Sequence, residues 1–179
     1  MSARRLADPY LATVRALNRV GVQYVVIGMS GINYYAQRAS EAIATMDYDL
    51  FVNPTLPNVQ KAVHQLSHLG FSLATSDGPF DTAALRALVR ARRALIATTP
   101  DGLMVELFLA VSGYLFAALV RDAVTITIQG TPVKVGRLSK LLRSKQLAGR
   151  LKDRQFLKRY QALLVEEVEP RPGIETRDK

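Results

Sequence analysis

Two pairs of short apolar segments, each joined by a tight turn, constrain the fold of this chain most strongly. Residues 93–99 and 103–110 flank a Pro-Asp-Gly turn, and the second pair turns at Gln-Gly within residues 124–135. Apolar, β-branched runs with this spacing predict two β-hairpins. Hairpin strands run antiparallel. Because helical segments separate the other strands, the pattern favours a mixed sheet rather than a purely parallel one.

The remaining segments alternate between strand and helix patterns. Apolar residues recur at helical spacing in several of them, while others are short β-branched runs. We expect strands at 24–28, 47–52 and 71–75, and helices at 9–20, 31–37, 56–69, 81–90, 112–121, 139–149 and 153–164. This order predicts an α+β domain with one mixed sheet, helices packed against it and a C-terminal helical pair.

The length of 179 residues favours one domain. We expect a core over 1–136, two basic helices of the same domain over 137–165, and a flexible tail over 166–179, where the residues are mostly polar.

Composition excludes several classes of protein. The chain has no cysteine, so disulfides, thiolate metal sites and cysteine nucleophiles are excluded. No apolar run approaches the roughly 18–20 residues of a membrane span, and the N-terminus does not resemble a secretory signal. We therefore expect no membrane partner and a cytoplasmic location.

The charge of the chain favours a polyanionic partner. The formal net charge is +9, and residues 134–159 contain ten basic residues and one acid, Asp153. Such clustering is typical of proteins that bind nucleic acid.

Two aspartates open the strand predicted at 47–52. Asp47 and Asp49 are two residues apart, so on a strand they project from the same face. Neighbouring carboxylates repel, and a divalent cation removes that repulsion. Mg²⁺ commonly binds one or two carboxylates together with substrate phosphates. The alternative is that both aspartates are turn or cap residues at the start of a strand.

Glu106 lies within another apolar run, Leu-Met-Val-Glu-Leu-Phe-Leu-Ala. A carboxylate in a buried strand is costly unless it is paired or bound to a metal. We predict that Glu106 joins Asp47 and Asp49 as a metal ligand. The alternative is an edge strand that presents Glu106 to water.

The segment Tyr-Val-Val-Ile-Gly-Met-Ser-Gly combines a strand, a small-residue turn and the start of a helix. This geometry suits phosphate, because backbone N–H groups at a helix start favour an anion. The spacing of Gly28 and Gly31 fits neither the P-loop nor the dinucleotide-binding motif. The alternative is an ordinary turn with Ser30 as the helix cap.

Lys145 falls on the leucine stripe of the helix predicted at 139–149. A lysine that points inward needs an anionic partner or a route to solvent. Asp153 shares a face with apolar residues of the last helix and can also turn inward. The alternative is a lysine that reaches solvent and an aspartate that caps its helix.

Together these residues resemble the nucleotidyltransferase superfamily, most closely the AbiEii and MenT-like toxin nucleotidyltransferases. The shared pattern is a glycine–serine turn (Gly28, Ser30), a D-x-D strand (Asp47, Asp49) and a third acid on a neighbouring strand (Glu106). The resemblance covers residues 20–160. Departures are Met29 in the turn, Glu in place of the more usual third Asp, and a long segment between the turn and D-x-D.

The resemblance implies an enzyme that transfers a nucleoside monophosphate from an NTP to an acceptor hydroxyl with Mg²⁺. Gly28 and Ser30 would contact phosphate, and Lys145 with Arg38 would offset charge on the pyrophosphate. Asp153 would help to activate the acceptor hydroxyl or make a structural contact. The implied acceptor is tRNA, in a toxin with a cognate antitoxin. Two alternatives stay open, which are a small-molecule acceptor such as an antibiotic and a catalytically silent RNA-binding domain.

Overall fold

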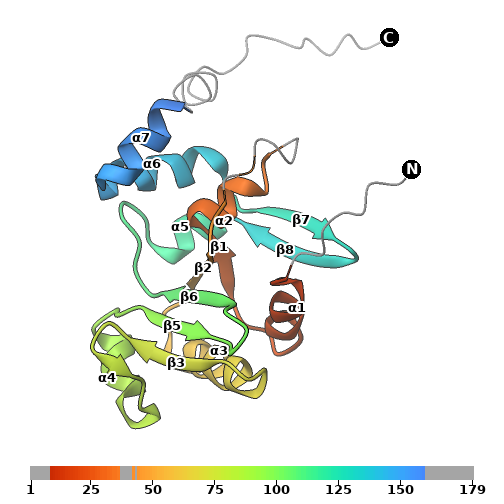
Figure 1. The fold of residues 1–179 in the computed structure, drawn as a ribbon, viewed down its shortest axis with the longest axis vertical. Helices are drawn as coiled ribbons and strands as arrows, with labels where there is room; N and C mark the ends of the chain where they lie inside the picture. Colours follow the sequence, from red (N-terminus) through yellow and green to blue (C-terminus); the bar gives the residue numbers. More distant parts are fainter. Residues whose placement is uncertain (1–8, 37–41, 43, 160–179) are drawn as a thin grey trace.

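The computed structural model describes residues 9–36, 42 and 44–159, and within them eight strands form one sheet (Figure 1). The sheet order is β4-β3-β5-β6-β2-β1-β8-β7. The strands are β1 (Tyr24–Val26), β2 (Asp47–Val52), β3 (Ser72–Thr75), β4 (Gly78–Pro79), β5 (Leu95–Thr98), β6 (Met104–Phe108), β7 (Val124–Ile128) and β8 (Thr131–Val135). The helices are α1 (Leu11–Arg19), α2 (Gly28–Asn33), α3 (Leu56–His68), α4 (Leu85–Arg90), α5 (Phe116–Val120), α6 (Leu138–Ala148) and α7 (Leu151–Arg159).

Both predicted hairpins are present, and the sheet is mixed as expected. Strands β5 and β6 pair antiparallel, as do β7 and β8. Strand β2 instead lies parallel to β6, and β1 lies parallel to β8. The β7–β8 turn has positive φ at Gln129 (47°) and Gly130 (74°), the two-residue type I′ geometry that matches the twist of a hairpin.

The two faces of β2 pack against different helices. Tyr48, Leu50 and Val52 point to one face, where the Tyr48 ring stacks 4.7 Å from the ring of Tyr10 beside α1. Phe51 points to the other face and contacts Phe116 of α5 edge to face, with ring centroids 5.4 Å apart. Asp47 and Asp49 alternate with Tyr48 and therefore lie on the face of Phe51 and α5.

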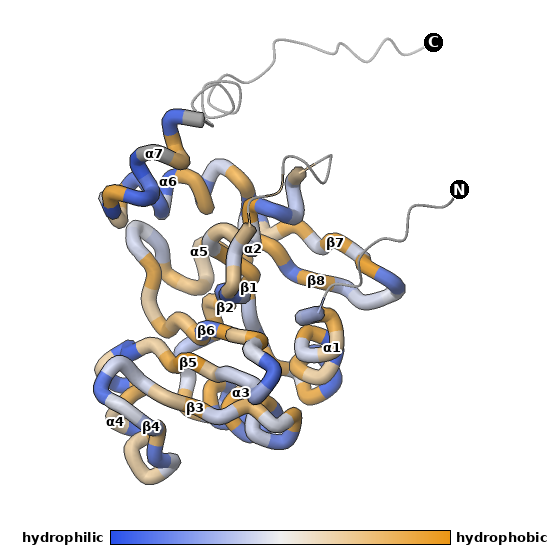
Figure 2. Tube along the Cα trace, in the orientation of Figure 1, coloured by the Kyte–Doolittle hydropathy of each residue, from blue (hydrophilic) through white to orange (hydrophobic). Residues whose placement is uncertain are grey.

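A continuous apolar core joins the helices to the sheet. In α3 the inward residues Val59, Ala62, Val63 and Leu66 are each no more than 4% exposed. Burying a side chain of the size of Val or Leu contributes roughly 1.5–3 kcal/mol. Figure 2 shows apolar residues along the central strands, whereas α7 is largely hydrophilic.

Helix α6 packs against Gly31 of α2 and against Gly136, which directly follows β8. A Cβ at Gly31 would lie 3.0 Å from Leu141 Cδ1, and one at Gly136 would lie 2.7 Å from Leu141 Cδ2. The small residues therefore let α6 approach the turn after β1. In Figure 1 the α6–α7 pair lies at the end of the molecule far from α3 and α4. The predicted tail lies outside the described residues.

Several helix boundaries differ from the sequence prediction. Helix α4, for example, begins at Leu85 rather than at residue 81, because residues 82–84 form a 3-10 turn. Helix α2 begins at Gly28, three residues early, because the chain already turns there with φ of 63°. Helix α5 begins only at Phe116, because Val111 and Tyr114 form a bridge around Gly113, whose φ is 84°. Helix α6 begins at Leu138, one residue before the predicted start at residue 139.

None of the described helices has both the length and the apolar character that crossing a membrane requires.

Candidate functional site

Three carboxylates meet on neighbouring central strands. The parallel pairing of β2 with β6 sets Asp49 opposite Glu106, and Asp47 opposite Met104. One carboxylate oxygen from each of Asp47, Asp49 and Glu106 lies within 4.8 Å of the others. Because β6 lies between β5 and β2, the edge-strand alternative for Glu106 is wrong. The sheet therefore brings together the three acids that the sequence predicts as one cluster.

Gly28 forms a cradle for the Asp49 carboxylate. Its φ is 63°, a conformation that glycine adopts at little cost. A Cβ at this position would lie 1.9 Å from Asp49 Oδ2, which is closer than any side chain tolerates. The predicted glycine turn is thus in contact with the predicted D-x-D strand, through the second aspartate.

Ser30 ties the same turn to the backbone of Asp49. Its hydroxyl donates to the Ile27 carbonyl at 3.2 Å and accepts from the Asp49 N–H at 2.9 Å. The Ile27 N–H also donates to the Asp49 carbonyl at 2.9 Å. Ser30 is only 6% exposed. The serine hydroxyl that the sequence assigns to phosphate is therefore engaged with the backbone that holds Asp49.

The environment of Asp49 disfavours its charged form. Burial, followed by the charges of Asp47 and Glu106, raises the pKa of Asp49 to about 7, although Lys145 and Lys152 act in the opposite direction. The Asp49 Oδ1 atom is buried and has no hydrogen-bond partner among the described residues. An unsatisfied buried carboxylate oxygen is costly, so this atom is the strongest sign of a missing ligand.

The surroundings of Glu106 also disfavour its charged form, though less strongly than those of Asp49. Burial and the charge of Asp47 raise the pKa of Glu106, and Arg150 and Lys152 lower it. The three acids thus form a crowded, partly desolvated set of oxygen donors. Hard divalent cations such as Mg²⁺ prefer such donors. Together with the cradle at Gly28 and the unpaired oxygen of Asp49, the donor set fits a bound divalent cation.

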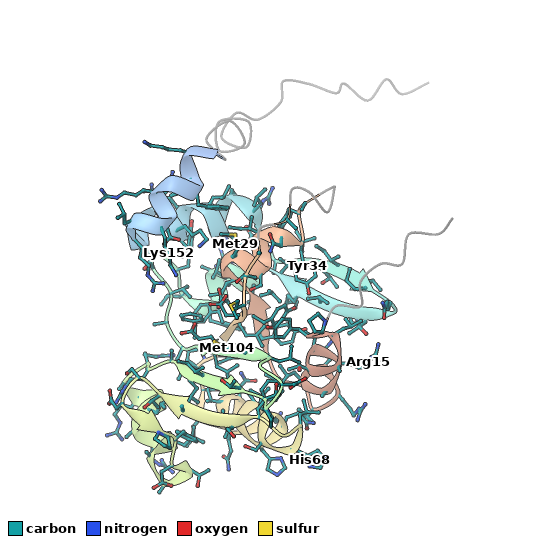
Figure 3. All side chains as sticks on the ribbon, in the orientation of Figure 1. Arg15, Met29, Tyr34, His68, Met104 and Lys152 are labelled. Atoms are coloured by element: carbon teal, nitrogen blue, oxygen red, sulfur yellow. The ribbon has the colours of Figure 1, made fainter. Side chains whose placement is uncertain are left out.

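Asp47 is held at the entrance to the cluster. The Thr45 hydroxyl hydrogen-bonds to the Asp47 carboxylate and also donates to the Asp47 carbonyl at 3.3 Å. A cavity of about 210 Å³ opens beside Asp47. Besides Asp47 and Ser30, it is lined by Tyr10, Asn33, Tyr34, Thr45 and Tyr48. Three of its seven lining residues are tyrosines, and Figure 3 marks one of them, Tyr34.

Lys145 and Asp153 form an ion pair between α6 and α7. Lys145 Nζ lies 3.0 Å from Asp153 Oδ1, and the two side chains are 16% and 7% exposed. The ammonium also lies 5.5 Å from the centre of the Phe156 ring. Both residues point inward, as predicted. Asp153 lies in the first turn of α7 rather than at its cap, so the cap interpretation is wrong.

Two basic residues near the acids were not among the predicted site residues. Arg150 and Lys152 follow the break at Gly149, whose φ of 64° reverses the chain between α6 and α7. Both lower the pKa of Glu106, which means that their charges act on the carboxylate cluster. Figure 3 shows Lys152 at the end of α7 that faces the sheet. The signal in the sequence was the pair of cations directly after a helix-ending glycine.

Arg38, predicted to contact phosphate, lies outside the described residues.

A larger cavity of about 430 Å³ lies between α1, α5 and β8, and none of the three acids lines it. Two of its polar side chains bond within the protein, since the Tyr24 hydroxyl donates to Asn18 Oδ1 at 2.9 Å and Asn18 Nδ2 donates to the Pro132 carbonyl at 2.8 Å.

No protein-family model matches this chain, and no curated protein matches it in sequence.

Proposed function

We propose that the protein is a metal-dependent nucleotidyltransferase, which moves a nucleoside monophosphate from an NTP to an acceptor hydroxyl. The observation that carries the proposal is the triad of Asp47, Asp49 and Glu106, in which a buried oxygen of Asp49 lacks a partner. The strand order around the triad agrees with the nucleotidyltransferase fold that the sequence resemblance implies. In that fold the D-x-D strand neighbours the strand of the third acid.

The reaction forms one bond and breaks one. The acceptor oxygen attacks the α-phosphorus of the NTP, and the bond from that phosphorus to the bridging oxygen breaks, so pyrophosphate leaves. The acceptor proton passes to a carboxylate or to water. A Mg²⁺ ion held by Asp47, Asp49 and Glu106 would supply Lewis-acid stabilisation of the phosphate oxygens.

The residues of the chain supply position and charge. Asp47 is oriented by Thr45, and Asp49 is fixed by Ser30 and Gly28. We assign Lys145 and Lys152 to the charge of the triphosphate, because their positive charges already act on Asp49. To reach phosphate, Lys145 must either break its ion pair with Asp153 or donate hydrogen bonds to Asp153 and to phosphate at the same time. Asp153 therefore positions Lys145 in the nucleotide-free protein.

The basic residues of α6 and α7 favour a polyanionic acceptor. Arg150, Lys152, Arg154 and Lys158 are exposed and follow one another on the segment next to the acids. RNA phosphates suit such a surface. We therefore infer that the acceptor is RNA, with tRNA as the first candidate. A toxin role and a cognate antitoxin belong to the same proposal.

Transfer of label from each of four α-labelled NTPs to total tRNA tests the proposal. We expect Mg²⁺-dependent labelling with at least one NTP, and a loss of at least about a hundredfold in Asp49→Asn. Asp77→Asn is the matched control, since Asp77 is an exposed acid paired with Arg93 on the surface. Absence of labelling with every NTP, or full activity of Asp49→Asn, would contradict the proposal.

The same assay separates the alternatives. Labelling of an aminoglycoside but not of tRNA indicates a small-molecule acceptor. Binding of RNA that is unchanged by Mg²⁺ and by Asp49→Asn, without any labelling, indicates a silent RNA-binding domain.

A further inference from the structure

The two edge strands of the sheet, β4 and β7, differ in how well they are protected against pairing with another chain. At one end, β4 has two residues and includes Pro79, which has no N–H to offer a neighbour. At the other end, β7 is a five-residue strand, Val-Thr-Ile-Thr-Ile, that pairs only with β8 among the described residues. It contains no charge and no proline. An edge strand without such protection is a template for pairing with another chain.

The hairpin geometry fixes which backbone groups of β7 face outward. The type I′ turn at Gln129 and Gly130 closes on the pair Ile128–Thr131, which is the hydrogen-bonded pair of a two-residue hairpin. Backbone direction alternates along an antiparallel strand. The N–H and C=O groups of Thr125 and Thr127 therefore point away from β8, where no other strand of the described residues pairs with β7.

The sequence of β7 is symmetric about Ile126. When two copies of β7 run antiparallel with Ile126 opposite Ile126, each Thr125 faces Thr127 of the other copy. Every aliphatic residue then faces an aliphatic residue, and no charges meet. From this symmetry we propose that β7 pairs with β7 of a second copy of the chain, joining the two sheets across a twofold axis.

The side chains on both faces of the proposed β7–β7 pair are consistent with this pairing. The two threonine pairs would exchange about four backbone hydrogen bonds, since each outward pair exchanges two. Their side chains are exposed, on the face that also carries Lys134 and Pro132. The Ile126 side chains meet at the centre on the other face, where β-branched pairs stabilise a sheet. A five-residue edge buries little area, so the dimer is weak and depends on concentration.

Sedimentation velocity over a range of protein concentrations tests the proposal. We expect the mass to rise from 19.7 kDa toward twice that value as the concentration increases. Thr125→Lys/Thr127→Lys sets lysines opposite each other in both threonine pairs, and should weaken self-association roughly tenfold. The control is Gln60→Lys/Ser67→Lys, which adds the same charge on the exposed face of α3. This control should self-associate like the wild type.

A complementary pair of variants tests the register. Thr125→Glu/Thr127→Glu should be monomeric alone and should dimerise when mixed with the double-lysine variant, because each lysine then faces a glutamate. Because the substituted side chains are exposed, each variant should fold like the wild type, and circular dichroism checks this. A wild type that stays at 19.7 kDa at all concentrations overturns the proposal. A dimer that the lysine substitutions leave intact, or a mixture that stays monomeric, overturns it as well.

Discussion

Asp49→Asn should stabilise the protein in the absence of metal, although it removes the residue most central to the proposed site. The substitution keeps the size of the side chain and removes its charge. The folded-state pKa of Asp49 is raised to about 7 from 3.8, so the folded protein binds a proton that the unfolded chain has lost. The wild-type stability is therefore fully present below about pH 4 and is lost as the pH rises to about 7.

The magnitude follows from the shift. About three pKa units correspond to roughly 4 kcal/mol, because one unit is worth about 1.36 kcal/mol. This is an upper value, since part of the carboxylate remains hydrated. At pH 8 we expect Asp49→Asn to gain about 2–4 kcal/mol in free energy of unfolding, and at pH 5 only about 1–2 kcal/mol.

Urea unfolding at pH 5 and pH 8, with a chelator and then with Mg²⁺, measures both effects. Mg²⁺ should stabilise the wild type and leave Asp49→Asn unchanged, because a ligand stabilises only the state that binds it. Asp77→Asn, which alters an exposed acid outside the cluster, should show no gain in stability over the wild type at pH 8 and should still be stabilised by Mg²⁺. A variant that is equally stable or less stable than wild type at pH 8 would refute the reasoning about burial and repulsion.

Three further substitutions test the neighbours of Asp49. Gly28→Ala should destabilise the fold by about 1–3 kcal/mol, from positive φ and contact with the carboxylate, and should abolish stabilisation by Mg²⁺ in a thermal melt. Ser30→Ala should cost about 1–2 kcal/mol and weaken the Mg²⁺ response more than NTP binding, whereas equal losses would favour a phosphate contact. Lys152→Ala should raise the KM for NTP several-fold, while Lys158→Ala, which removes an equally exposed lysine further along α7, should not.

The clustering of the three acids was predictable because it depends on strand periodicity. Alternation along β2 sets Asp47 and Asp49 on one face, and the cost of burying Glu106 indicated a shared site. The parallel register of β2 with β6, which sets Asp49 opposite Glu106, completes the cluster. Hairpin turns were also readable, since each depends on two or three adjacent residues.

The parts that the sequence did not reveal depend on contacts between distant segments. The hydrogen bonds of Ser30 join two strands that are far apart along the chain, and no local pattern distinguishes them from a helix cap. Likewise, the sequence around Arg150 and Lys152 looks like the exposed surface of any basic helix. Only the reversal at Gly149 brings their charges to act on Glu106.

The most direct test of the central claim is the position of a divalent cation in a crystal grown with Mn²⁺ and a non-hydrolysable NTP. We expect an anomalous difference peak between the carboxylates of Asp47, Asp49 and Glu106, within about 2.0–2.6 Å of their oxygens, with nucleotide phosphate beside it. A structure with nucleotide or Mn²⁺ bound elsewhere, and with no peak among these three carboxylates, would contradict it.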